Sequence, residues 1–238
     1  MTKNIYHNSR LHLLDTLRGF SIIYVVFYHA IFNLSLTNAW AYNLLYSPAM
    51  EISQFIFVGI LIFISGICTK LTRSNLKRGL KTLAAAMLVT AVSAIIAPNM
   101  TIIFGILHFF AAAMLIYAFF GKLVDKIPAA IGIPLFSLLW LFTYNIYDYA
   151  PKMPKSIILF ILGFKTGHMS GDYYPLIPHL FLFLLGAIIG RFIKRENAPR
   201  LLTINPLPPI SFIGRHTLLI YLIHQPVLYG ISFILSII

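Results

Sequence analysis

Two residues whose side chains could do chemistry, Arg18 and His29, lie inside one strongly apolar run, residues 14–36. An ionisable group in a membrane span costs roughly 3 kcal/mol or more, so it indicates a functional site by default. Arg18 and His29 are eleven residues apart, which puts both on one helix face and about 16 Å apart along the helix axis. A guanidinium binds anions, and a neutral imidazole can accept a proton or act as a nucleophile.

The same helix face carries Asp15 before Arg18 and Asn33 after His29. A structural role is open for each ionisable residue: Arg18 could snorkel to the surface or pair with Asp15, and His29 could form a hydrogen bond between helices. One polar tunnel along this helix accounts for Arg18 and His29 together more economically than two separate structural roles.

Further polar residues stand in or beside later apolar segments. His108 is expected at nearly the same depth as His29, so the two histidines could converge if their helices pack together. Asp172, in SGDYYPLIPHL, could orient a histidine or bind an amine or hydroxyl, or it could cap the helix that follows it or the preceding turn. Tyr173 is the next residue, and His179 is expected at the membrane interface.

The last apolar segment, residues 213–237, contains Arg215 near its start and His224 near its middle. Nine residues separate them, so on a continuous helix they point to opposite faces, although Pro226 is expected to bend it. Gly186 and Gly190 form a GxxxG pair, which favours close helix packing either within the chain or between chains, and a homo-oligomer is left open.

The composition is that of a membrane protein: 59% of the 238 residues are hydrophobic, 10% are charged and the mean hydropathy is +0.87. Such a composition excludes an ordinary soluble domain. The net charge of +12 reflects basic loops on one side of a membrane, so no nucleic-acid partner is expected. The single cysteine, Cys68, excludes an intrachain disulfide.

We predict an all-α, polytopic membrane helix bundle forming one domain over residues 1–238, with about seven spans and a cytoplasmic N-terminus. Pro134 interrupts the fifth span, and the apolar stretch 156–164 is too short to cross a membrane. The predicted spans are residues 14–36, 52–72, 80–97, 102–121, 129–146, 176–194 and 213–237. The orientation rests on basic residues expected in the cytoplasm: Lys3, Arg10, Lys70, Arg73, Lys77, Arg78, Lys81, Lys122, Lys126, Arg191, Lys194, Arg195 and Arg200.

Several site classes lack their sequence signatures. The chain has no HxH, HExxH or Cys/His cluster, so no metal site is expected, and it has no Walker loop, dinucleotide fingerprint or GxSxG motif.

Four segments, in this order, carry a family resemblance: RLHLLDTLRGFSIIYVVFYHAIFNL, FGILHFFAAAMLIYA, GDYYPLIPHLFLFLLGAIIGR and IGRHTLLIYLIHQPVL. Together they resemble the heparan-alpha-glucosaminide N-acetyltransferase catalytic-domain family, whose small bacterial members match this chain in length. The spacing of Arg18 and His29 also resembles that in the wider group of membrane O-acyltransferases. The resemblance extends over nearly the whole chain.

The resemblance implies a membrane acyltransferase that moves an acetyl group from cytoplasmic acetyl-CoA to a sugar amine or hydroxyl on the far side of the membrane. It implies embedding in membrane lipids, here the inner membrane of a bacterium, and it makes His29 the catalytic histidine. The lysosomal relatives carry an essential histidine in the loop after the first helix, whereas residues 37–51 contain none. We assign His29, His108 and Asp172 to catalysis, Arg18, Arg215 and Asp15 to acetyl-CoA, and Asn33, Tyr173 and His179 to the acceptor.

The chemistry of the donor agrees with this assignment. Coenzyme A has an anionic head, which arginine binds well, and a long thin arm that could reach from Arg18 to His29. His29 would act as a general base or form an acyl-histidine. Two alternatives are a small transporter or permease with an Arg/His substrate or proton path, and a scaffold without catalysis. The absence of an internal repeat disfavours an inverted-repeat transporter.

Overall fold

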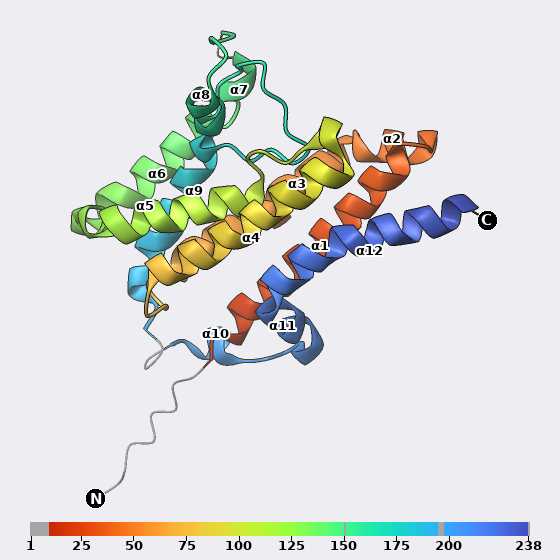
Figure 1. The fold of residues 1–238 in the computed structure, drawn as a ribbon. Helices are drawn as coiled ribbons and strands as arrows, with labels where there is room; N and C mark the ends of the chain where they lie inside the picture. Colours follow the sequence, from red (N-terminus) through yellow and green to blue (C-terminus); the bar gives the residue numbers. More distant parts are fainter. Residues whose placement is uncertain (1–9, 150, 195–197, 238) are drawn as a thin grey trace, which may run out of the picture. The chain divides into compact units, whose positions relative to one another are not determined.

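The computed structural model describes residues 10–149, 151–194 and 198–237. Every regular element in these ranges is a helix (Figure 1), which confirms the all-α class. Lys3 and Arg195, on which the predicted orientation partly rests, lie outside the described residues. The chain divides into two compact units: unit 1 lies within Met1–Leu61 and Lys194–Ile238, and unit 2 is Ile62–Ile193.

The helices follow the predicted apolar segments with shifted ends. Those of unit 1 are α1 (His12–Ser35), α2 (Ala39–Leu45), most of α3 (Pro48–Ile67), α10 (Arg200–Thr203), α11 (Pro208–Arg215) and α12 (Thr217–Ile237). Those of unit 2 are the end of α3, α4 (Asn75–Ile96), η1 (Pro98–Met100), α5 (Ile106–Lys126), α6 (Ala129–Thr143), α7 (Ile146–Tyr149), α8 (Ile157–Leu162), α9 (Leu176–Ile189) and η2 (Gly190–Phe192).

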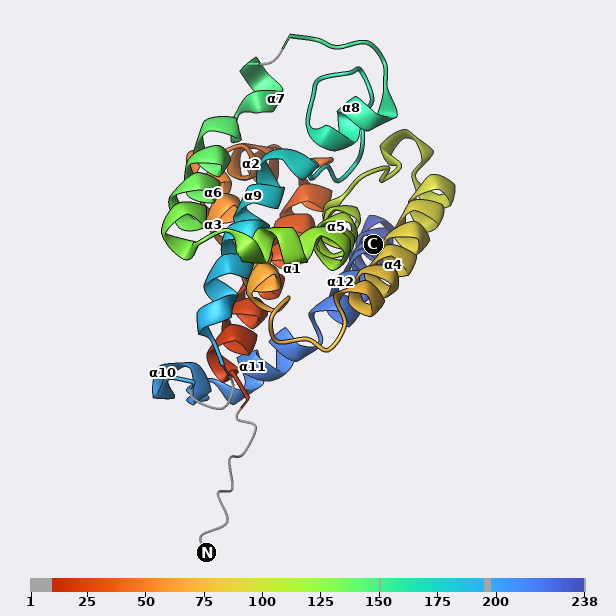
Figure 2. The ribbon, with the colours of Figure 1, turned by 90° about the vertical axis from the view of Figure 1, so that its left-hand side faces the viewer.

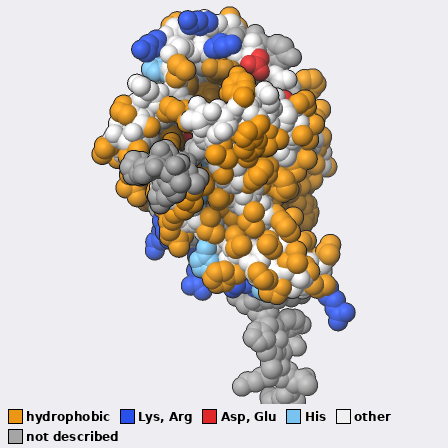
Figure 3. Space-filling model, turned by 90° about the vertical axis from the view of Figure 1, so that its right-hand side faces the viewer, with side chains coloured by type: hydrophobic (Ala, Val, Ile, Leu, Met, Phe, Trp, Pro, Cys, Tyr) orange, Lys and Arg blue, Asp and Glu red, His pale blue; other side chains and the backbone are white. Residues whose placement is uncertain are grey.

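Five helical segments in the described residues are long and apolar enough to cross a membrane, which makes this an integral membrane protein. They are His12–Ser35, Pro48–Ile67, Asn75–Ile96, Ile106–Lys126 and Ala129–Asp148. Large apolar side chains such as Phe142 (84% exposed) and Ile95 (81%) face outward. Hydrophobic side chains cover most of the face drawn in Figure 3, as a lipid-facing surface requires.

The predicted seventh span is wrong as a single helix, because the chain breaks at His216 between α11 and α12. At the break, the backbone of His216 has φ −106° and ψ 19°, which is not a helical conformation. Arg215 and His224 therefore belong to different helices, and the argument that they occupy opposite faces of one helix does not apply.

Two other expectations concern short or interrupted segments. Pro134 lies inside α6, so it does not interrupt this helix as predicted. The apolar stretch 156–164 forms only the six-residue α8, which ends at Gly163 with φ 116° and confirms that it is too short to span.

Unit 1 is built on the packing of α1 against α11 and α12 (Figure 2). At the α1–α11 crossing, Gly19 lies against the backbone of Ile210, and Gly214 lies against the backbone of Asp15 and Gly19. A Cβ atom on either glycine would overlap the other helix. On α1 itself, the buried positions include Asp15, Ile22, Val25 and Asn33, as the predicted polar face requires.

Unit 2 packs α4 on α5 and both α5 and α6 on α9, as Figures 1 and 2 show. Its centre contains the fully buried side chains of Phe109, Phe183 and Ile188. At the junction of α3 and α9, Gly186 and Gly190 lie against the backbone of the last turn of α3, while Gly66 lies against the carbonyl of Phe183. The GxxxG pair thus serves packing within the chain.

We expect Gly186→Ala to lower the melting temperature of the detergent-solubilised protein, because the added methyl group meets the Phe63 carbonyl. Overpacking of this kind costs about 1–3 kcal/mol. The matched control is Gly230→Ala on α12, where a Cβ atom would have nothing within 4 Å. Both changes gain the same helix propensity, so equal shifts in melting temperature would contradict the packing assigned to Gly186.

Candidate functional site

In unit 1, α1 and α12 bring His29 together with two polar residues of α12. The Nε2 atom of Gln225 lies 2.8 Å from the Nδ1 atom of His29. The ring of His224 has its centroid 4.9 Å from that of His29. His224 is buried, with 6% of its surface exposed, and its Nδ1 atom donates to the carbonyl of Tyr221. No pattern in the sequence indicates the Gln225 contact, because 196 residues separate Gln225 from His29.

The Gln225 contact determines the protonation pattern of His29. The amide nitrogen of glutamine can only donate, so Nδ1 of His29 is the acceptor. A neutral imidazole that accepts at Nδ1 carries its proton on Nε2. In this arrangement, His29 offers an N–H group rather than a lone pair at Nε2.

Asn33 lies one helical turn beyond His29 on the same face of α1 and is 9% exposed. Both its amide oxygen and its amide nitrogen are buried without a hydrogen-bond partner in the described part of the chain. A buried amide without partners costs about 1–3 kcal/mol. The polar group beside His29 is therefore suited to a ligand that supplies both a donor and an acceptor.

At the other end of α1, Arg18 does not pair with Asp15, which was one of the alternatives left open from the sequence. Asp15 instead accepts a hydrogen bond from Nε of Arg10 at 2.8 Å. Arg18 is half-buried and makes no hydrogen bond or ion pair within residues 10–149, 151–194 and 198–237. Arg215, exposed at the end of α11, stacks its guanidinium over the Phe212 ring, 5.1 Å from the centroid. Arg18 and Arg215 each adjoin a glycine of the α1–α11 crossing.

In unit 2, His108 stands in the first turn of α5 with both ring nitrogens engaged. Nδ1 accepts from the backbone N–H of Gly105 at 3.2 Å, and Nε2 lies 3.0 Å from the hydroxyl of Thr90. That hydroxyl donates to the carbonyl of Ile102 at 2.7 Å, so Nε2 of His108 must be the donor to Thr90. These contacts tie the start of α5 to α4 and leave no ring nitrogen of His108 for proton transfer.

Asp172 caps the start of α5, whereas α9, the helix that follows it in sequence, begins without a side-chain cap. One carboxylate oxygen accepts from the backbone N–H of Ile106 at 3.2 Å. A Cβ atom at Gly105 would lie 2.6 Å from the same oxygen, so the glycine makes room for the carboxylate. The hydroxyl of Ser170 accepts from the N–H of Ile103 and donates to the carbonyl of Asp172. The loop therefore supports the helix that carries His108.

Tyr173 and His179 are held by backbone carbonyls. The hydroxyl of Tyr173 donates to the carbonyl of Phe160 at 2.6 Å, and its ring stacks on that of Phe160. Burial and the neighbouring Tyr147 raise the pKa of Tyr173, so it remains a donor. The Nδ1 atom of His179 donates to the carbonyl of Pro175 at 3.0 Å, which leaves the lone pair on Nε2.

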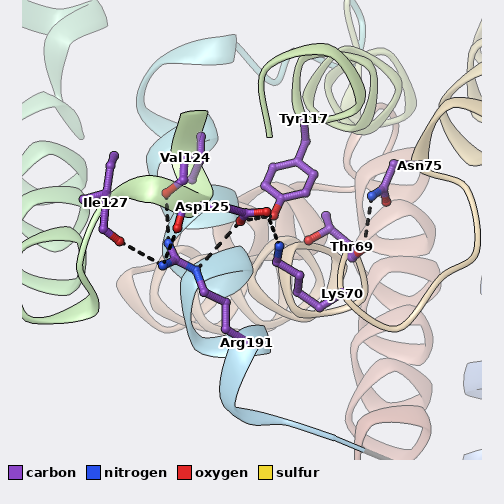
Figure 4. A network of polar contacts seen from close by, with 8 residues as sticks. All are labelled: Thr69, Lys70, Asn75, Tyr117, Val124, Asp125, Ile127 and Arg191. Atoms are coloured by element: carbon purple, nitrogen blue, oxygen red, sulfur yellow. Dashed lines mark hydrogen bonds and ion pairs between the residues drawn. The ribbon is translucent and has the colours of Figure 1, made fainter. Parts of the chain in front are cut away.

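Asp125, for which no role was predicted from the sequence, is the centre of a polar network in unit 2 (Figure 4). Its carboxylate accepts from Lys70 at 2.5 Å and from the hydroxyl of Tyr117 at 2.9 Å, and lies 3.8 Å from Nε of Arg191. Arg191 also donates to the carbonyls of Val124, Asp125 and Ile127, which end α5. One feature of the sequence could have indicated this network. Asp125 lies inside the basic segment KLVDK and is one of only six acidic residues in the chain.

This network joins three segments that contain basic residues predicted in the cytoplasm. Lys70 precedes the basic residues 73–81, Asp125 lies between Lys122 and Lys126, and Arg191 follows α9. Burial lowers the pKa of Lys70, but its contacts with Asp125 and Tyr117 outweigh burial and raise the pKa overall. The grouping agrees with the prediction that the three loops share one side of the membrane.

We expect Asp125→Asn to lower the melting temperature, because Lys70 and Arg191 would then face each other without the carboxylate. The groups are partly exposed, so the loss should be about 1 kcal/mol and should shrink at high salt. Asp148→Asn, at an exposed carboxylate, is the matched control. A melting temperature for Asp125→Asn equal to that of the control at low salt would contradict the role of Asp125.

The described residues contain no group of three or more His, Cys, Asp or Glu side chains placed to hold a metal ion. A family model described as heparan-alpha-glucosaminide N-acetyltransferase, catalytic, matches residues 10–226 of the 238. Comparison with curated proteins and with solved structures found no match. The family match gives no support to the transporter alternative. Because it covers far more than half of the chain, the protein belongs to the heparan-alpha-glucosaminide N-acetyltransferase catalytic family, and its apolar helices identify it as an integral membrane acetyltransferase.

Proposed function

We propose that the protein transfers an acetyl group from cytoplasmic acetyl-CoA to an amine or hydroxyl of a sugar on the opposite side of a bacterial inner membrane. The observation that carries the proposal is on α1: half-buried Arg18, which has no partner in the described residues, shares a helix face with His29, which lies in a polar cluster. The family supplies the reaction type. The cytoplasmic N-terminus predicted from the basic residues would put the Arg18 end of α1 on the side of the donor.

The donor site is proposed at the α1–α11 crossing. Arg18 lacks a protein counter-ion among the described residues, and Arg215 is exposed at the adjacent helix end. Guanidinium groups bind phosphate through paired N–H donors. With the anionic head at this end, the thin arm of acetyl-CoA would run along α1 for about 16 Å and bring the thioester to His29. Asp15 holds Arg10, so its role is to brace this end of α1.

At His29, we propose that Nε2 removes a proton from the acceptor amine or hydroxyl as it attacks the thioester carbonyl. A C–N or C–O bond forms, the C–S bond breaks, and the imidazolium returns its proton to the departing thiolate of coenzyme A. Asn33, one turn away with an unpaired amide, is suited to bind the sugar. His179, with a lone pair on Nε2, is a second candidate acceptor contact, whereas His108, Asp172 and Tyr173 support the structure around α5 and α8.

The acyl-histidine route places the acetyl group on His29 before it reaches the acceptor. Both routes need the lone pair on Nε2, so His29 is essential in each. Incubation with radiolabelled acetyl-CoA, without any acceptor, separates them: label retained on the protein and lost in His29→Gln indicates the acyl-histidine route.

We expect the purified protein to bind acetyl-CoA at micromolar concentration in calorimetry. Arg18→Met should weaken this binding about tenfold or more, because a charge-assisted contact to phosphate is lost. Arg200→Met, at an exposed arginine on α10, is the control and should bind as the wild type does. Unchanged affinity in folded Arg18→Met would contradict the proposed donor site.

We expect His29→Gln to lower acetyl transfer to glucosamine-containing acceptors by about 10²-fold or more while leaving acetyl-CoA binding and the melting temperature near wild type. Transfer is measured by release of free coenzyme A and by mass spectrometry of the acceptor. His168→Gln, in the loop before α9, is the matched control. Full activity in His29→Gln would exclude His29 as the catalytic group.

A further inference from the structure

Gln225 is the only described side chain seen to hydrogen-bond to the ring of His29. Its amide nitrogen faces Nδ1 at 2.8 Å, and its amide oxygen is buried without a hydrogen-bond partner within the described residues. The orientation of this one amide therefore decides which ring nitrogen of His29 carries the proton.

The proposed chemistry requires the opposite proton arrangement. A base that accepts at Nε2 has its proton on Nδ1, and the imidazolium that follows also has a proton there. An amide N–H group facing Nδ1 cannot accept that proton, whereas the amide oxygen can. The orientation seen here thus holds His29 in a resting state, and a half-turn of the amide would prepare it to act as a base.

The two orientations have similar hydrogen-bond counts. In each, one end of the Gln225 amide bonds to His29 and the other end stays unpaired, and the half-turn changes no side-chain volume. The neighbouring His224 does not compete for the amide through Nδ1, because that atom donates to the Tyr221 carbonyl. Gln225 is therefore free to follow the protonation of His29 in a way that a fixed carboxylate or backbone carbonyl is not.

We propose that Gln225 is the positioning residue of the catalytic histidine: its amide turns between donating to Nδ1 of His29 at rest and accepting from it when His29 acts as a base. The inference rests on the proposed function of His29 for its catalytic part. Its structural part, that residue 225 sets the tautomer of His29, stands on the hydrogen bond itself.

The structural part is tested by magic-angle-spinning NMR on lipid-embedded protein with ¹⁵N-labelled histidine, in which His29→Gln identifies the His29 signals. The wild type without ligand should show the proton on Nε2. Gln225→Glu offers only acceptor oxygens when ionised and should move the proton to Nδ1, while Gln225→Met should leave a mixture. Gln54→Met, on α3, is the matched control. An identical His29 tautomer in all variants would overturn the inference.

The catalytic part is tested by kinetics on the same variants. Gln225→Met should lower kcat about tenfold or more with little change in the KM for acetyl-CoA, as expected when a histidine loses the group that fixes its tautomer. Gln225→Glu should retain transfer, which a merely structural glutamine would not predict. Wild-type kcat in Gln225→Met, or loss of transfer in folded Gln225→Glu, would overturn the catalytic part.

The two experiments separate this inference from the proposed function. If the tautomer follows residue 225 but the wild type transfers no acetyl group to any acceptor, the positioning contact is upheld and the function fails. If transfer depends on His29, but the His29 tautomer and kcat are the same in all Gln225 variants, the function stands and the inference fails.

Discussion

Direct contact between helix backbones at glycine residues is the constraint on which the arrangement of polar groups depends. Helices in a bilayer gain little by burying apolar surface against each other, so packing at close range holds them together. In unit 1, Gly19 and Gly214 let α11 lie against the backbone of α1. In unit 2, Gly66 and Gly186 do the same for α3 and α9. A methyl group at any of these positions would displace a helix and every polar side chain that it carries.

Within these packed helices, the hydrogen-bond partners of each histidine indicate its chemistry more clearly than its position in the sequence does. His108 and His29 both sit in apolar helices and both accept a hydrogen bond at Nδ1. The donor to His108 is a backbone N–H group, which cannot turn, and its Nε2 is also engaged by Thr90. The donor to His29 is a side-chain amide with an unpaired oxygen. One histidine is fixed in a single tautomer, and the other can exchange.

The sequence predicted the features that repeat along one helix and missed those that join distant segments. The apolar segments, the buried face of α1 and the short α8 follow from periodicity and length. The cap that Asp172 provides to α5 links residues 66 positions apart, and the Lys70–Asp125 ion pair links residues 55 apart. The division of the last span at His216 depends on the backbone conformation of that one residue. Hydropathy alone cannot register such a local change.

A comparison of two arginines indicates where an anionic ligand belongs. The two terminal nitrogens of Arg191 donate to the carbonyls that end α5, and its charge is paired with Asp125. Arg18 is also half-buried, yet Asp15, an acid on the same helix face, is held by Arg10 instead. A partly desolvated guanidinium without a counter-ion is costly unless a ligand compensates for it. Among these two, only Arg18 gains from a phosphate, and the helix that carries it leads directly to His29. The physical cost of leaving Arg18 unpaired is thus the strongest structural argument for an anionic donor at this end of α1.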